Sequence, residues 1–272
     1  MKKYILSILL SGAFMFTACS DFLDEVPKGN ITSEGYYKTA QHAISATNAI
    51  YDYLIIGYAP NGLWDKNYGG TFYNDYWVLQ DMFADNSETN QTSIDYQSVE
   101  NMQIDQYNQP VELLWRDFYQ TIKCCNVVID KVPSIDMDVT LRNQLVAEAK
   151  FFRAMMYFDL IRMFGDVPLR EHNVESAEED ATSRTSKETI YELIFSDLKT
   201  AETDLKYTER FGGGRPYPAS ASALLARVYL TYAAEHHSQE HYQLAVDKAK
   251  SVIPNFRSEE RRVGKECRSR WS

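Results

Sequence analysis

The chain has 272 residues, and its 38 acidic side chains outnumber its 28 basic ones to give a net charge of −10. A chain this acidic is not expected to bind nucleic acid, because phosphate contacts need Lys and Arg. Hydrophobic residues make up 44% of the sequence, which is enough for one good core or for half of a larger one.

The N-terminus has the order of a secretion signal. Lys2 and Lys3 precede an uncharged, mostly apolar run at 4–16, and small residues then lead to Cys19. The run is shorter than the roughly 20 residues that a membrane-spanning helix needs. Thr17-Ala18-Cys19 resembles a lipobox, in which the Cys becomes the acylated first residue. We therefore expect residues 1–18 to be a lipoprotein signal peptide and Cys19 to carry lipid. Ordinary secretion with a chance Cys is the alternative.

Apolar residues at intervals of three and four predict helices along most of the chain. A first helix is expected near 36–54. A second at 110–132, with Pro110 in its first turn, carries Trp115 on its apolar stripe. A third at 141–163 is apolar on two faces, which predicts burial on both sides at the centre of the fold. Asp136 and Asp138 precede it as an acidic lead-in, suited to the positive end of a helix.

A fourth helix is expected to begin with a capping box, with Thr185 as N-cap and Glu188 reaching back to it. Two further helices follow, near 219–234 and 240–253. Leu225, Ala226 and Tyr229 in one, with Ala245, Ala249 and Pro254 in the other, fit a degenerate tetratricopeptide unit. No alternating run predicts a strand. The sequence thus predicts an all-α, tetratricopeptide-like scaffold of helical pairs.

Residues 58–110 are expected to form a long, irregular insertion, and a loop of this length in a compact domain is usually functional. The segment holds ten aromatic residues and many acidic ones, with Lys66 as its only basic residue. Sugar rings stack on aromatic faces, and carboxylates and amides bond their hydroxyls. We expect at least two exposed rings, although any single ring can serve only to fix the loop. The candidate ligand-binding residues are Trp64, Asn67, Tyr68, Tyr73, Asn74, Asp75 and Trp77.

The sequence gives little indication of metal binding, disulfide bonds or catalysis. His236, His237 and His241 straddle the joint between two helices, where solvated histidines are far commoner than metal ligands. Cys124 and Cys125 are neighbours that cannot easily bridge each other, so we expect them to be buried as small apolar residues. The chain has no serine nucleophile elbow, zinc signature or phosphate-binding glycine loop. We therefore expect no catalytic residue, metal or cofactor. A glycosidase carboxylate pair stays open as an alternative, because sequence does not fix the distance between two acids.

The C-terminal segment 257–272 reverses the charge of the chain, with six basic residues against three acidic ones and no hydrophobic period. It resembles a translated sequencing adapter. We expect it to be an artefact, so that the genuine domain is 19–256 and is truncated after Phe256.

Several stretches resemble the SusD/RagB family of nutrient-binding lipoproteins: CSDFLD at 19–24, AEAKFFRA at 147–154 leading to FGDVP at 164–168, and ALLARVYL at 223–230. GRPYP at 214–218 departs from the usual loop, where a Thr-Lys pair is common. The resemblance covers essentially all of 19–256. Family members are roughly twice as long, which implies that a C-terminal half is missing.

The resemblance implies a non-enzymatic protein that is lipid-anchored on the outer surface of the outer membrane. It would capture glycans and deliver them to a SusC-like TonB-dependent transporter. A RagB-like peptide binder and a surface glycoside hydrolase are the alternatives.

Overall fold

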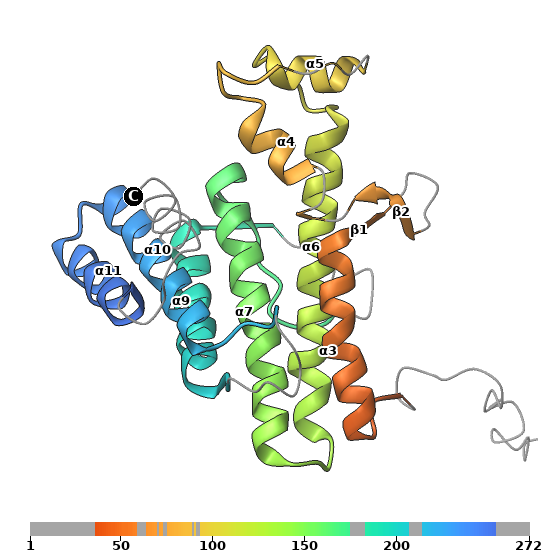
Figure 1. Cartoon of the computed structure of the whole chain (residues 1–272), viewed down its shortest axis with the longest axis vertical. Coiled ribbons are helices and arrows are strands. Elements are labelled where there is room, and N and C mark those ends of the chain that lie inside the picture. Colours follow the sequence, from red (N-terminus) through yellow and green to blue (C-terminus); the bar gives the residue numbers. More distant parts are fainter. Residues whose placement is uncertain are drawn as a thin grey trace, which may run out of the picture. The chain divides into compact units, whose positions relative to one another are not determined.

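The computed structural model describes residues 36–58, 64–69, 71–72, 75–88, 90, 93–174, 183–206 and 214–253, and the chain from Tyr37 onward forms one unit. Helices dominate the described residues (Figure 1). The long helices are α3 (Ala40–Ile55), α6 (Gln109–Lys131), α7 (Val139–Phe164), α9 (Lys187–Asp204), α10 (Pro218–His236) and α11 (Gln239–Val252). The shorter ones are α4 (Asp75–Asp81), α5 (Ile94–Glu100) and the 3₁₀ turn η3 (Val132–Ser134). The predicted all-α class is confirmed.

The long helices pack in chain order, each against the next, with α3 on α6, α6 on α7, α7 on α9, α9 on α10 and α10 on α11 (Figure 1). Short connections favour this arrangement for α6 with α7 and for α10 with α11, because a helix and its successor then lie antiparallel and share an apolar seam. In the last pair Leu225, Tyr229 and Ala245 are buried, as the tetratricopeptide pattern predicts. His237, with φ 53°, ends α10 in the left-handed conformation, and Ser238 caps α11.

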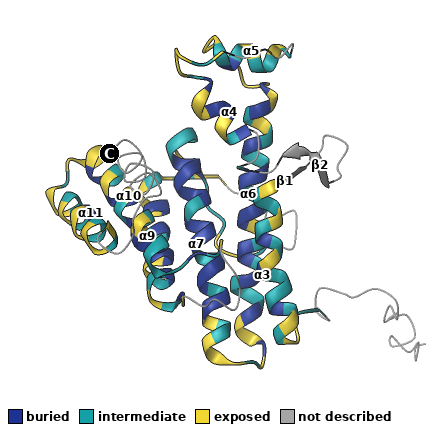
Figure 2. Cartoon of the chain, viewed as in Figure 1, coloured by how far each residue is buried: buried dark blue, intermediate teal, exposed yellow. Residues whose placement is uncertain are grey.

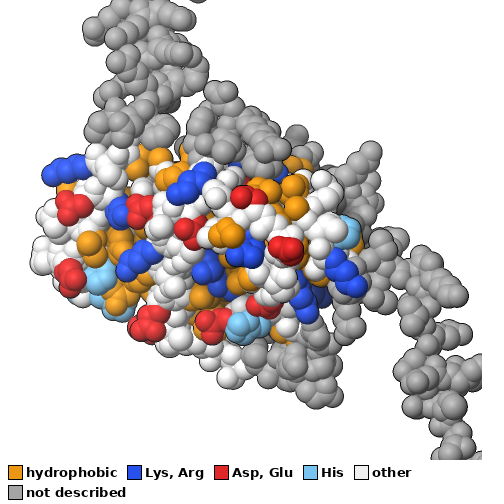
Figure 3. Space-filling view, turned by 90° about the horizontal axis from the view of Figure 1, so that it is seen from below, with side chains coloured by type: hydrophobic (Ala, Val, Ile, Leu, Met, Phe, Trp, Pro, Cys, Tyr) orange, Lys and Arg blue, Asp and Glu red, His pale blue; other side chains and the backbone are white. Residues whose placement is uncertain are grey.

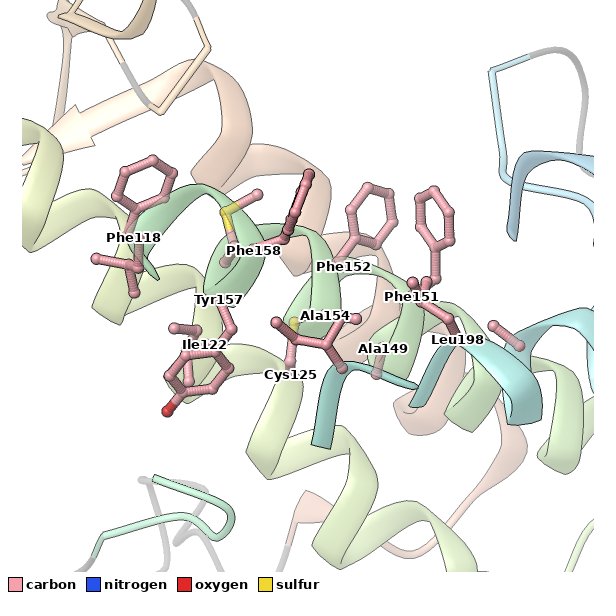
Figure 4. Close-up of a cluster of buried hydrophobic side chains, with 14 of the residues drawn as sticks. Phe118, Ile122, Cys125, Ala149, Phe151, Phe152, Ala154, Tyr157, Phe158 and Leu198 are labelled. Carbon is pink, nitrogen blue, oxygen red and sulfur yellow. The ribbon is translucent and has the colours of Figure 1, made fainter. Parts of the chain in front are cut away.

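Helix α7 lies at the centre, between α6 and α9 (Figure 4). Leu145, Ala149 and Met156 are fully buried on one face, and Ala154 and Phe158 are buried on another. Figure 2 shows buried residues over most of the length of this helix. The prediction from its two apolar faces is confirmed.

The ends of α6 and α7 are fixed by local signals. Asn108 accepts a hydrogen bond from the Val111 backbone and Pro110 occupies the first turn of α6, where its missing N–H leaves no helix bond unmade. Asp138 caps α7 by accepting from the Leu141 amide at 2.8 Å. Gly165, with φ 72°, terminates α7 in a conformation that other residues avoid.

One expectation about a helix cap is wrong. The N-cap of α9 is Ser186, whose hydroxyl accepts from the Thr189 amide, and not Thr185. Thr185 lies one residue too early because it pairs with Val167 in a short strand. Trp115, on the expected apolar stripe of α6, is partly buried and packs against the core, where its ring meets Phe164 of α7.

The insertion is more regular than expected. It contains α4 and α5, and β2 (Trp64–Gly69) pairs antiparallel with β1 (Ile56–Tyr58). A second ladder joins β3 (Val167–Pro168) to β4 (Arg184–Thr185). These pieces have two to seven residues each, which is too short for a periodicity window of 11–18 residues to detect.

Candidate functional site

Helix α4 carries two aromatic residues of the insertion, Tyr76 and Trp77. Phe72 donates its backbone amide to the Leu54 carbonyl at 3.1 Å, which ties the start of this segment to α3. The Phe72 and Tyr76 rings meet edge to face at 5.0 Å, and Tyr76 meets Phe118 of α6 at 6.5 Å. Such edge-to-face pairs are worth about 0.5–1.5 kcal/mol each beyond buried area, and the Tyr76–Phe118 pair holds α4 against α6.

Tyr76 also has a polar partner on the central helix α7. Its hydroxyl bonds Asp159 of α7, which is 4% exposed. Burial raises the pKa of the Asp159 carboxyl, and the nearby Arg162 and Arg227 oppose that rise. Burial, followed by the Asp159 charge, raises the pKa of the Tyr76 phenol. The ring of Tyr76 is therefore a structural contact and not a free binding surface.

Trp77 lies on a different side of α4 from Tyr76. Its side chain is 47% exposed, whereas Asp75 is only 2% exposed. Successive helix residues differ by about 100° in direction, so three neighbours point to three different sides. The arrangement offers a broad indole for stacking at Trp77. The Asp75 carboxylate, by contrast, faces the interior.

The backbones of Trp64, Asn67 and Tyr68 lie in β2, and their side chains lie outside the described residues. Tyr73, Asn74 and Cys19 also lie outside them, as do the predicted signal peptide and the segment 257–272.

One further exposed ring was not among the predicted ligand residues. Tyr107, just before α6, is 78% exposed. Its backbone amide donates to the Asp105 carboxylate at 2.8 Å, a turn that fixes the local backbone. A polar flank of Asp105, Gln106 and Asn108 is the sequence signal that could have indicated it.

Two of the three histidines, His236 and His241, contact aromatic rings. His236 stacks on Tyr232 at 4.1 Å, and the ring of His241 lies 4.5 Å from the same tyrosine. Nδ1 of His241 is 2.8 Å from the Ser238 hydroxyl. Within the described ranges, no three His, Cys, Asp or Glu side chains gather as metal ligands would.

Acidic and basic side chains alternate over the described surface in Figure 3, without a broad patch of one sign on that face. None of the helices in the described part of the chain is both long enough and apolar enough to cross a membrane.

Comparison with known proteins gives this fold a family. The family described as "Starch-binding associating with outer membrane", a SusD-like group, matches residues 21–230. The chain belongs to the SusD-like family. A curated relative, SusD-like protein P2 of Formosa agariphila, is 31% identical over 94% of this chain and 47% of its own length.

Solved structures agree with the fold. A laminarin binding SusD-like protein is similar with a TM-score of 0.63 and 27% identity, over 79% of this chain and 44% of that one. A SusD superfamily protein from Bacteroides vulgatus has a TM-score of 0.67 at 23% identity, covering 81% of this chain and 44% of that one. This SusD-like chain thus spans about half the length of the relatives it matches.

Proposed function

We propose that this SusD-like protein binds oligo- or polysaccharides at the cell surface without catalysis and passes them to a SusC-like TonB-dependent transporter. The family match over residues 21–230 carries the proposal. The exposed indole of Trp77, on a helix held rigidly by Tyr76, supports it, because a fixed ring loses little entropy when a sugar stacks on it. The laminarin binding relative indicates the class of ligand.

The proposed site is the insertion, with Trp64, Asn67, Tyr68, Tyr73, Asn74, Asp75 and Trp77 as its candidate residues. Trp77 is the residue that the described geometry favours most.

Three of the acids buried among the long helices do not form a glycosidase pair. Burial raises the pKa of Glu148, Asp159 and Asp197, and each lies against an arginine. A glycosidase instead needs two carboxyl groups facing each other across a cleft that admits the sugar. These three acids are interior residues, so they serve the fold.

A binding panel tests the proposal. The purified protein is titrated calorimetrically with laminari-, xylogluco- and malto-oligosaccharides and with a mixed peptide pool, and each mixture is assayed for new reducing ends. We expect binding to at least one saccharide and no reducing ends. Binding to peptides alone would favour the RagB-like alternative. Reducing-end release that survives repurification would instead establish a hydrolase.

Attachment at Cys19 and the transporter are tested in cells. Cys19→Ser is expected to abolish palmitate labelling and release the protein from the membrane fraction, since stable anchoring needs more than one acyl chain and lipoproteins carry several on that one residue. Cys124→Ser is the matched control and should leave labelling unchanged. A tagged wild-type protein is expected to co-purify with an outer-membrane β-barrel transporter after mild crosslinking. Membrane retention of Cys19→Ser would contradict the anchor.

A further inference from the structure

An open pocket of about 380 Å³ lies on the N-terminal half of α6. Its volume is within the roughly 300–1,000 Å³ of small-molecule sites. One wall comes from a single side of α6 and consists of Glu112, Trp115, Arg116, Tyr119 and Gln120. Pro168 and Arg170, which follow α7 in the chain, form the other wall.

The pocket is on a different side of α6 from the insertion contact. An α-helix turns about 100° per residue, so residues spaced by three, four, seven and eight share a side. The five wall residues have this spacing. Phe118, which meets Tyr76 of α4, points roughly a third of a turn away from the centre of that side. The pocket is therefore separate from the side of α6 that holds Tyr76.

The far wall is held in place by hydrogen bonds from both long helices. The Tyr119 hydroxyl donates to the Pro168 carbonyl at 2.8 Å, and Asn126 of α6 donates to the Arg170 carbonyl at 2.9 Å. The Arg170 amide donates to the Tyr157 hydroxyl of α7 at 2.7 Å. A wall fixed in this way is ready for a ligand, so little ordering free energy is lost on binding.

The rings of the pocket are fixed as well. Trp115 lies 5.1 Å from Tyr119 and meets Phe164 edge to face at 4.9 Å. The Arg170 guanidinium lies over the Tyr119 ring at 5.6 Å. Trp115 is only partly buried, so its contact with Phe164 leaves part of the indole facing the pocket.

Polar groups surround these rings. Arg116 donates to the Glu112 carboxylate at 2.5 Å, and Gln120 adds an amide one turn further on. A carboxylate, a guanidinium and an amide together supply both acceptors and donors. Rings with such groups beside them match a pyranose, which has apolar C–H faces and a circle of hydroxyls.

We propose that this pocket is a second carbohydrate-binding site, in which one sugar unit stacks on Trp115 and its hydroxyls bond Arg116, Glu112 and Gln120. The inference rests on the proposed glycan-binding function and extends it to a second contact point. Two sites on one protein raise its apparent affinity for a long polysaccharide more than for a short oligosaccharide, because the second binding event becomes intramolecular.

Variants of the polar groups test the proposal without disturbing the rings. The double variant Arg116→Ala/Gln120→Ala is compared with wild type and with Lys123→Ala, an exposed change on α6 that does not line the pocket. Affinity electrophoresis in gels containing laminarin, xyloglucan or soluble starch measures polysaccharide binding. Thermal unfolding verifies that each variant is folded. Trp115→Phe, which keeps a ring against Phe164, is a second variant that acts on stacking alone.

We expect the double variant to bind its polysaccharide about 3- to 10-fold more weakly, as loss of hydrogen bonds to sugar hydroxyls predicts, and Lys123→Ala to bind like wild type. A matching oligosaccharide should still bind the double variant through the insertion. If wild type binds a polysaccharide and both pocket variants bind it equally well, the second site is refuted and the proposed function stands. If wild type binds none of the three polysaccharides and no oligosaccharide, the proposed function fails and the second site fails with it.

Discussion

Arg153 of α7 and Asp197 of α9 form a two-point ion pair in the interior of the protein. The Nε–Oδ2 distance is 2.7 Å and the Nη2–Oδ1 distance is 3.0 Å. The Arg153 side chain is 5% exposed and that of Asp197 is 2% exposed. Arg153 also donates to the Asn126 side chain and to the Glu171 carbonyl, so one guanidinium joins α6, α7, α9 and the segment after α7.

Removing this guanidinium should destabilise the protein strongly. We expect Arg153→Met to lower the free energy of unfolding by about 3–5 kcal/mol, because Asp197 would stay buried without its partner. The measurement is urea unfolding followed by circular dichroism. Arg153→Met/Asp197→Leu removes both charges and should recover part of the loss. A loss below about 1 kcal/mol for the single change would contradict the role we give the pair.

Glu148 is expected to make the free energy of unfolding depend on pH. Its carboxylate accepts from Arg215 at 2.7 Å and from the Tyr51 hydroxyl at 3.0 Å. Burial raises its pKa above the ordinary 4.5, and Arg215 only partly opposes this rise. The folded state therefore holds this proton more tightly than the unfolded state does. The stabilisation that Glu148 contributes to the folded state is therefore fully present below pH 4.5. It is lost as the pH rises through the pKa of Glu148 in the folded protein.

Comparing wild type with Glu148→Gln isolates that contribution, because Asp159 and Asp197 titrate in both proteins. We expect the free energy of unfolding of wild type, measured in urea between pH 4 and 7, to fall relative to the variant as pH rises. A relative rise would mean that Arg215 outweighs burial.

The neighbouring thiols should react slowly. Cys125 is fully buried, and burial raises its pKa well above the ordinary 9.0. Burial raises the pKa of Cys124 to about 11, so at pH 8 about one molecule in a thousand carries the reactive thiolate. We expect peptide mapping after iodoacetamide treatment at pH 8 to find both residues largely unmodified in the native protein and fully modified in urea. Rapid native labelling of Cys124 would contradict the burial argument.

The cap of α7 offers a matched pair of substitutions. Asp138 accepts from the Leu141 amide at 2.8 Å, whereas Asp136 is exposed and lies outside the helix. We expect Asp138→Ala to lower the free energy of unfolding by about 1 kcal/mol and Asp136→Ala to change it by less than about 0.5 kcal/mol. Thermal and urea unfolding of both variants measure this difference. Equal effects would indicate a general charge effect and not a cap.

Substitution of Trp77 tests directly whether the insertion binds glycans. We expect Trp77→Ala to weaken binding of the responsive oligosaccharide by about 10-fold or more, as loss of a central aromatic contact does. Calorimetry with that oligosaccharide measures the change. Tyr242→Ala removes a partly exposed ring from α11, far along the chain from the insertion, and should leave affinity unchanged. Wild-type affinity in Trp77→Ala would remove this residue from the site.

The long helices and the burial of α7 can be predicted from the sequence alone, because the spacing of apolar residues and the identity of caps such as Asp138 act over a few residues. The same stretches of sequence also indicate the family. The sequence pattern does not predict α4, and it does not predict β4, whose pairing with β3 leaves Ser186 and not Thr185 as the N-cap of α9. Both elements depend on contacts with distant segments.

Which side chains are accessible depends on how the helices pack. Asp75 and Trp77 are two residues apart and read alike as candidates, yet packing of α4 on α6 buries one and exposes the other. The pocket likewise joins Tyr119 to Pro168, 49 positions apart. Local periodicity carries no information about such a distant contact, which exists only once α6 and the segment after α7 have packed together.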